Sequence, residues 1–310
     1  MKVCATIDLD DYEDYARLLA PDRGGPDPST LSFYDEAIPR FLDLFDRHGT
    51  RATFFVVGRD AANGTRARRV REIAERGHEV GNHSYSHPYN FRALSRAEKA
   101  AEIVQAEAAI SDAVGERPVG FRTPSCDVDL ETLELLEERG YLYDSSVFPS
   151  PIMWAFMLYG KLFVKHENYQ LGHPLAALAP REPYFPGFEQ IHRRRAPSDA
   201  RSPRILEVPF SVLPGTRFPF YNTLLRRLGT RFFDAMLRAF GTREPLLHLV
   251  FHMIEMAEFG ETELGRSYGR TPGLAVPLAA RERFIAHVVE SGARSAEPVT
   301  LREFAASYAA

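Results

Sequence analysis

The sequence predicts an α/β fold, a distorted (β/α) barrel of about seven or eight parallel strands with an irregular rim insertion. Short apolar runs of strand type alternate with amphipathic helical stretches through most of the 310 residues. Repeated βα units in this number favour a parallel barrel over a single open sheet. The alternation breaks between about 149 and 204, where prolines and loop-like sequence predominate. We therefore predict one domain over residues 1–310, with an insertion at about 149–204 near one rim.

The predicted strands are short apolar runs that lead into polar sequence. The run 52–57 is continuously apolar, as expected for a strand that is buried on both faces. Val3 to Ile7 forms a second such run, and it leads into an acidic loop. The remaining predicted strands are 78–81, 118–121, 141–144, 205–210, 246–251 and 299–300.

The predicted helices carry apolar residues at intervals of three and four, and several end at glycine. The stretch 35–48 places five apolar side chains on one face and is followed by Gly49. Ser95-Arg96-Ala97-Glu98 forms a capping box, which opens a helix that runs to about residue 114. The other predicted helices are 66–76, 129–139, 221–240, 278–289 and 301–308.

Composition and charge exclude several classes of protein. Hydrophobic residues make up 45% and charged residues 26% of the chain, which is ordinary globular composition and excludes wholesale disorder. The net charge of −4 provides no basic surface for nucleic acid, so we expect no nucleic-acid partner. Two cysteines, Cys4 and Cys126, exclude a disulfide framework and a cysteine-rich zinc module. They suit either one disulfide bridge or a reducing compartment.

The sequence also bears on location. Its first residues reach acidic side chains after a few apolar ones, whereas a signal peptide needs a longer apolar region and a cleavage site. The longest apolar stretch, 152–163, is shorter than the roughly 20 residues that span a bilayer. We therefore expect a cytoplasmic protein without a transmembrane segment, and peripheral association with a membrane stays open.

Polar residues follow the predicted strands where each strand ends. In (β/α) barrels the reactive groups lie on the loops after the carboxyl ends of the strands, so these residues meet at one rim. His83 and His87 are spaced so that a helical turn or tight loop presents both imidazoles to one ion. With one carboxylate they make a His₂Asp set with an open position for water, as in catalytic zinc sites, and other first-row divalent ions bind the same groups. The residues in these loops are Asp8, Asp10, Asp11, Asn82, His83, His87, Arg122, Asp144 and His252.

The acidic run that begins at Asp8 allows several interpretations. A calcium loop of EF-hand type needs Gly at position six and Glu at position twelve, where this chain has Glu13 and Leu19. The run is also similar to the nucleophile loop of haloacid-dehalogenase-type phosphotransferases, with Asp8 attacking phosphorus, but Tyr12 stands where that pattern has Thr or Val. A third interpretation gives one carboxylate to a metal and leaves the other as a general base. A solvated acidic loop is the alternative without a function.

Four blocks of sequence together resemble one family. They are Asp8 with Asp10, the run 52–58, the run 77–87, and Phe121-Arg122-Thr123-Pro124. In this order they resemble the polysaccharide deacetylases, the NodB-homology group or carbohydrate esterase family 4 (CE4), in a divergent Asp-x-Asp branch. The resemblance is clear from residue 1 to about 148 and thin from 205 to 255. It implies a distorted (β/α) barrel and metal-dependent hydrolysis of an N-acyl group, acetyl or formyl, from an amino sugar or similar amide.

The resemblance also implies a ligand set. By position, His83 and His87 bind the metal, which is Zn²⁺ or another divalent first-row ion. The usual family sequence has two adjacent aspartates, which Leu9 separates here. In the Asp-x-Asp form the second aspartate is the ligand, so Asp10 takes that role and Asp11 remains an alternative.

The catalytic roles follow by the same correspondence. Asp8 aligns with the general base, and Arg122 holds that aspartate. The fifth motif supplies a general acid, for which His252 is preferred over His248 because it falls where the strand ends. The fourth motif supplies Asp144, without the tryptophan that usually accompanies it. A catalytically inactive carbohydrate-binding relative and the phosphotransferase remain the rival hypotheses.

The implied partner is an amino-sugar-containing small molecule, an oligosaccharide or a lipid-linked sugar. Within the insertion, the stretch 152–163 holds the only tryptophan of the chain. We consider three accounts of it: a buried helix packed on the barrel, a contact between subunits of a homo-oligomer, or an apolar lid that receives a lipid carrier or acyl tail beside the metal.

Overall fold

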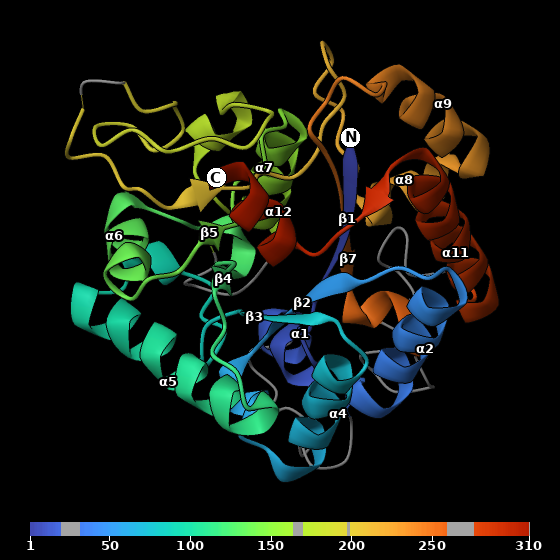
Figure 1. Ribbon diagram of the computed structural model, residues 1–310, viewed down its shortest axis with the longest axis horizontal. Helices are drawn as coiled ribbons and strands as arrows, with labels where there is room; N and C mark the ends of the chain where they lie inside the picture. The colour runs from blue at the N-terminus through green and yellow to red at the C-terminus, as the bar shows by residue number, and fades with distance from the viewer. Residues whose placement is uncertain (20–31, 164–169, 197–198, 259–275, 310) are drawn as a thin grey trace.

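The computed structural model describes residues 1–19, 32–163, 170–196, 199–258 and 276–309. These residues form a curled sheet whose strands all run parallel, in the order β6-β5-β4-β3-β2-β1-β7, with β8 beside the start of β1. The predicted α/β barrel is therefore confirmed (Figure 1). The strands are β1 (Lys2–Asp8), β2 (Ala52–Val56), β3 (Glu79–Asn82), β4 (Gly120–Phe121), β5 (Tyr143–Asp144), β6 (Leu206–Glu207), β7 (Leu246–His252) and β8 (Glu297–Pro298).

Helices surround the curled sheet, and α2, α4, α5 and α11 lie along its outside in Figure 1. Short 3₁₀ turns follow several strands: η1 (Phe91–Ala93), η2 (Pro124–Cys126), η3 (Pro174–Leu178) and η4 (Met253–Met256). The helices of the described residues are α1 (Tyr12–Leu19), α2 (Tyr34–Arg47), α3 (Gly58–Ala61), α4 (Gly64–Glu75), α5 (Arg96–Val114), α6 (Leu130–Glu138), α7 (Ile152–Phe163), α8 (Asn222–Leu228), α9 (Thr230–Phe240), α11 (Leu278–Ser295) and α12 (Leu301–Ala309).

Several predicted elements differ from the structure. The acidic run after β1 was expected to be a loop, but from Tyr12 onward the chain forms α1. The single helix predicted over 221–240 is two helices, because Gly229 adopts φ +83° between them. The last strand is at 297–298 and not at 299–300. Thr300 instead directly precedes α12, and its N–H donates to the Glu303 carboxylate at 2.9 Å.

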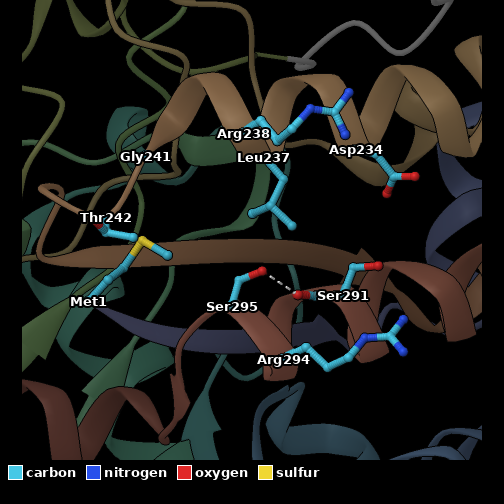
Figure 2. Close-up of a pocket in the computed structure, with 9 residues that line it drawn as sticks. All are labelled: Met1, Asp234, Leu237, Arg238, Gly241, Thr242, Ser291, Arg294 and Ser295. Atoms are coloured by element: carbon cyan, nitrogen blue, oxygen red, sulfur yellow. Dashed lines mark hydrogen bonds between the residues drawn. The ribbon is translucent and has the colours of Figure 1, made fainter.

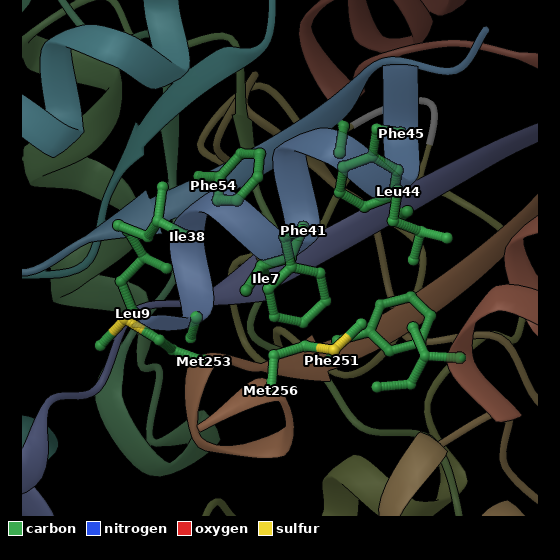
Figure 3. Close-up of a cluster of buried hydrophobic side chains, with 14 of the residues drawn as sticks. Ile7, Leu9, Ile38, Phe41, Leu44, Phe45, Phe54, Phe251, Met253 and Met256 are labelled. Atoms are coloured by element: carbon green, nitrogen blue, oxygen red, sulfur yellow. The ribbon is translucent and has the colours of Figure 1, made fainter. Parts of the chain in front are cut away.

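The largest hydrophobic core holds β1 and β7 side by side. Figure 3 shows aromatic side chains of α2 packed on the sheet: the Phe41 ring lies 6.2 Å from that of Phe251, and the Phe45 ring lies 6.1 Å from that of Phe54. All four side chains are fully buried. Because this core fixes the register of β1 on β7, it places Asp8 directly opposite His252 at the ends of the two strands.

The two ends of the sheet, β6 and β7, are bridged by a side chain. Ser211, four residues after β6, donates its hydroxyl to the Leu246 carbonyl at 3.2 Å and accepts the His248 N–H at 2.8 Å. This contact brings the segment that follows β6 against the interior of β7.

The 149–204 segment contains α7, and that helix exposes apolar side chains. Met153 is buried, whereas Leu158 is 58% and Leu162 63% exposed. We call Trp154, Leu158, Tyr159 and Leu162 the outward face of α7; each is close to half exposed or more. The account of a buried helix is therefore wrong for this face, because it faces away from the barrel. None of the helices in the described ranges is both long and apolar enough to cross a membrane.

Candidate active site

The predicted site residues gather at the carboxyl ends of the strands. Asp8 ends β1, and Asp10 follows it. His83 follows β3, Arg122 follows β4, and His252 ends β7. Since β1 lies between β2 and β7, Asp8 at the end of β1 is directly beside His252 at the end of β7.

Asp10, His83 and His87 form a compact group with the geometry of a metal site. Oδ1 of Asp10 lies 3.3 Å from Nε2 of His83 and 3.2 Å from Nε2 of His87, and the three prospective ligand atoms lie within 4.8 Å of one another. All three residues are buried. Among the described residues, Oδ1 of Asp10 and Nε2 of His87 are buried without a hydrogen-bond partner. Buried polar atoms are rarely left unpaired, so these orphaned atoms fit a bound cation.

The electrostatics of the group agree with this geometry. Burial alone raises the pKa of Asp10, but the two imidazoles overcome that effect and hold its pKa well below the usual range. Nδ1 of His83 lies 2.8 Å from the Arg122 carbonyl, which accepts a hydrogen bond from it. In the neutral imidazole this bond places the proton on Nδ1, so Nε2 of His83 is the nitrogen that can bind a metal. Nitrogen and oxygen donors of this kind suit zinc and its first-row neighbours.

The loop that carries the histidines is held by Asn82 and by Glu102, of which only Asn82 was expected near the site. Ser84 and His87 adopt positive φ values of 63° and 55°, which tighten the loop. Glu102 of α5 accepts the N–H groups of Tyr85 and Ser86, each at 2.8 Å. Asn82 accepts the Ser84 N–H at 2.9 Å, so it shapes the loop from the end of β3.

A charged cluster supports His87 from behind. Oδ1 of Asp14 lies 3.6 Å from Nδ1 of His87. Asp14 also accepts hydrogen bonds from Arg17 at 2.6 Å and Arg59 at 2.5 Å. Both arginines donate in addition to the Ser86 carbonyl, at 2.9 and 2.6 Å, and so fasten the histidine loop to α1. This helix was expected to be a loop, although its acidic first turn and basic last turn are signals typical of a helix.

Asp11 lies outside the metal group. Its carboxylate forms an ion pair with Arg66 at 2.8 Å and accepts the Phe33 N–H at 2.7 Å. The structure therefore brings Asp10, and not Asp11, to the two histidines.

Asp8 is held by Arg122, as the resemblance implied. Nη1 of Arg122 donates to Oδ1 of Asp8 at 2.6 Å, and the arginine is 1% exposed. Nε2 of His252 lies 3.8 Å from Oδ2 of the same aspartate. The Tyr221 ring packs edge-on against the His252 ring at 5.6 Å. The prospective base and acid thus face each other across the β1–β7 pair.

Asp144 and His248 lie deeper. Asp144 accepts the Ser146 hydroxyl at 2.8 Å and is the register partner of Glu207 on β6. Burial raises the pKa of both carboxyl groups, and the charge of Asp144 raises that of Glu207 further. His248 is fully buried on β7, four residues before the strand ends. The catalytic role of Asp144 stays a prediction.

A hollow of about 410 Å³ lies at the opposite end of the strands (Figure 2). It lies between α9 and α11, beside Met1, which precedes β1. It is therefore separate from the rim that carries the aspartates and histidines. Its lining residues are Met1, Asp234, Leu237, Arg238, Gly241, Thr242, Ser291, Arg294 and Ser295.

Comparison with known proteins adds a family. Residues 24–143 match the polysaccharide deacetylase family. The chain is 31% identical over 107 residues to the peptidoglycan-N-acetylglucosamine deacetylase of Bacillus cereus, a stretch that is 34% of this chain and 38% of that protein. The chain thus spans less than two fifths of that relative. The matched family region includes His83, His87 and Arg122, whereas Asp8, Asp10 and His252 lie outside it.

Solved structures show the same fold. A crystal structure of a candidate polysaccharide deacetylase from Mycobacterium smegmatis superposes with a TM-score of 0.59 at 22% identity, covering 99% of this chain and 89% of that one. A CE4 family pseudoenzyme from Bacillus anthracis superposes with a TM-score of 0.50 at 14% identity, covering 98% of this chain and 65% of that one. Residues 24–143 are thus similar to the polysaccharide deacetylase family, and the barrel is shared with solved structures of this fold.

Proposed function

We propose that this protein is a metal-dependent hydrolase that removes an N-acyl group, acetyl or formyl, from an amino sugar or sugar conjugate. The observation that carries the proposal is the buried group of Asp10, His83 and His87, with its unpartnered ligand atoms, beside the Asp8–Arg122 ion pair. We extend the proposal to the whole chain, 1–310, as one catalytic domain with the 149–204 segment as a rim insertion.

Asp10, His83 and His87 would hold the metal, which is Zn²⁺ or another divalent first-row ion. Such an ion, when bound, lowers the pKa of a water ligand to near 7 and polarises a carbonyl oxygen. Three protein ligands leave a coordination position open, which is the arrangement of catalytic and not of structural zinc.

Asp8 is the proposed general base. The Arg122 guanidinium occupies Oδ1 of Asp8, which leaves Oδ2 on the side of His252 to accept the proton of the attacking water. His252 is the proposed general acid. It gives a proton to the departing amine nitrogen, which is otherwise a very poor leaving group. Because the two residues are register partners, one strand pair sets the separation of base and acid.

In this proposal Asp144, which lies between β4 and β6 at the rim, orients the loop that follows β4. Its carboxylate fixes the Ser146 hydroxyl, which in turn accepts the Thr123 N–H at 2.8 Å. Thr123 follows Arg122 directly, so Asp144 helps to set the loop that supplies the arginine.

The proposed substrate is an amino-sugar-containing small molecule, an oligosaccharide or a lipid-linked sugar. The name of the Bacillus cereus relative, a peptidoglycan-N-acetylglucosamine deacetylase, supports an N-acylated amino sugar as the reacting unit. The inactive carbohydrate-binding alternative is kept because a protein with this fold is described as a pseudoenzyme.

The test combines metal analysis with acyl release. Purified protein should contain one zinc per chain and release acetate or formate from N-acylated amino sugars or their oligomers. Chelation should abolish the release, and added Zn²⁺ should restore it. Stoichiometric metal and sugar binding without acyl release would identify the inactive relative. Transfer of a phosphoryl group to the protein, lost in Asp8→Asn, would identify the phosphotransferase.

A further inference from the structure

We propose that His248 is the positioning residue for Arg122: its Nε2 accepts a hydrogen bond from the guanidinium and so fixes the arginine that holds Asp8. The inference rests on the proposed function, in which Asp8 is the general base. It also gives His248 a role other than the general acid considered from the sequence.

The contacts of His248 define which of its nitrogens carries the proton. Nδ1 lies 3.2 Å from the carbonyl oxygen of Pro209, which is an acceptor only. Nδ1 must therefore be the protonated nitrogen, and Nε2 presents a lone pair. That lone pair lies 3.2 Å from Nη2 of Arg122, which is a donor only. The two neighbours thus select one neutral tautomer.

A charged imidazolium does not fit this position. It would turn a proton on Nε2 toward the guanidinium, with two like charges at hydrogen-bond distance in a fully buried site. Burial and the charge of Arg122 lower the pKa of His248 to about 3, in agreement with the contacts. At neutral pH His248 is therefore not an imidazolium, and its one N–H donates to the Pro209 carbonyl and not to a leaving amine.

The surroundings of Arg122 explain why it needs such an acceptor. Its guanidinium carbon lies 4.2 Å from the ring centroid of Phe55 and 4.8 Å from that of Phe210. Contact with two aromatic rings holds the cation near them but does not fix its orientation. That orientation must be set by hydrogen bonds along the edge of the guanidinium.

Those hydrogen bonds come from three directions. Nε of Arg122 donates to the Ser145 carbonyl at 2.8 Å, and Nη2 donates to the Ser145 hydroxyl at 3.0 Å. Nη1 donates to Asp8 at 2.6 Å and to Oγ1 of Thr6 at 3.1 Å. His248 is the contact from β7, and its Nε2 also lies 3.0 Å from Oγ1 of Thr6. Without His248, Nη2 keeps only the Ser145 hydroxyl among these partners. That hydroxyl also donates a hydrogen bond to the Val208 carbonyl at 2.8 Å.

The first measurement needs no activity. The experiment is a long-range ¹H–¹⁵N correlation spectrum of the zinc-loaded protein with ¹⁵N-labelled histidine. It should show His248 as the neutral Nδ1–H tautomer from about pH 5.5 to about pH 8, a range that includes the ordinary histidine pKa. An Nε2–H tautomer, or protonation within this range, would overturn the proposal. Arginine side-chain spectra of His248→Leu should show the Arg122 Nε and Nη signals shifted, whereas the matched buried-histidine control His78→Gln leaves them in place.

The second measurement separates positioning from general structural damage. We expect His248→Leu to keep its zinc and its KM and to lose kcat by roughly 10- to 100-fold, the scale of a displaced catalytic group. His248→Gln supplies a new acceptor to Arg122 and should recover most of the loss. Equal losses in both variants, with the Arg122 signals of the wild type retained, would refute the role. If the wild type releases no acyl group, the proposed function fails, while the tautomer and the Arg122 signals still decide the contact.

Discussion

The sharpest test of the site is to replace Asp8 and Asp10 by asparagine, one at a time. Asp8→Asn keeps the shape of the side chain and an acceptor for Arg122 but removes the charge that takes up a proton. Because Asp8 is not one of the three grouped ligands, the variant should keep its metal. Loss of a general base costs about 10²- to 10⁴-fold in rate, or about 2.7 to 5.4 kcal/mol of activation free energy.

The same substitution has a cost in stability. Arg122 is 1% exposed and pairs with Asp8 at 2.6 Å. Breaking a buried ion pair by removing one charge costs about 3–5 kcal/mol. The amide oxygen of the Asp8→Asn variant still accepts the hydrogen bond, so we expect a loss below that range, of about 1–3 kcal/mol.

Asp10→Asn is the matched control, since it makes the same chemical change two residues along the chain. Oδ1 of Asp10 lies 3.3 Å from Nε2 of His83 and 3.2 Å from Nε2 of His87. Loss of a residue that only hydrogen-bonds to a metal ligand weakens metal binding by about 10- to 100-fold, so changing Asp10 itself should weaken zinc binding at least as much. The Asp8–Arg122 ion pair stays intact.

The assay measures zinc affinity by competition with a chromogenic chelator, and acyl release at saturating zinc. If Asp8→Asn emptied the site while Asp10→Asn kept its metal, the two roles would be exchanged. Turnover of Asp8→Asn above about a tenth of the wild type would refute the general-base assignment, because it lies well outside the range for a lost base.

Four further results are expected. His83→Ala should abolish stoichiometric zinc binding and activity while circular dichroism shows a folded barrel; activity in the metal-free variant would contradict the ligand set. Gly120→Ala should lower the free energy of unfolding by at least about 2 kcal/mol in urea, because its Cβ would lie 2.0 Å from a buried tyrosine ring, and an unchanged midpoint would contradict that contact. Burial lowers the pKa of His78 to about 4, so as the pH falls the unfolded chain binds a proton at this histidine before the folded chain does, and the free energy of unfolding should fall by up to about 3 kcal/mol between pH 6.5 and 4. His78→Gln should flatten this part of the curve of stability against pH, and an unaltered curve would show that His78 is not its cause. The double substitution Leu158→Ser with Leu162→Ser should leave the protein folded, and unfolding would restore the buried-helix account. In the folded variant, a smaller size on gel filtration indicates a subunit contact. A KM raised only for lipid-linked substrates indicates a lid.

The sequence predicted the barrel and the rim because both depend on local patterns. Each strand was recognisable from a few apolar residues, and the rule that reactive groups follow parallel strands then collected Asp8, His83, Arg122 and His252 in one place. Strand ends were off by one to three residues, as for Asn82, which belongs to β3 and was expected in the loop. An error of that size in a strand boundary still leaves each site residue at the carboxyl end of its strand.

What could not be predicted depends on side chains from distant elements. The supports of the histidine loop come from α1, α3 and α5, and no local pattern announces that Glu102 will accept two amide hydrogens from residues 85 and 86. The role of His248 depends on the register of β7 with β1 and on the stacking of Arg122. The exposure of α7 was equally hidden, because an apolar run predicts a helix without showing what covers it.

The place of β1 between β2 and β7 has a consequence for how the protein is made. Its neighbours are β2, which follows within about fifty residues, and β7, whose His248 contacts Thr6 across a separation of 242 residues. While the ribosome synthesises the intervening chain, one edge of β1 stays unpaired, with its backbone N–H and C=O groups open to other strands. Asp10, His83 and His87 are all present early in synthesis, long before His252. A nascent chain can therefore gather its metal ligands well before it is able to complete the acid–base pair, and β7 both seals the exposed edge and delivers the residue that faces Asp8.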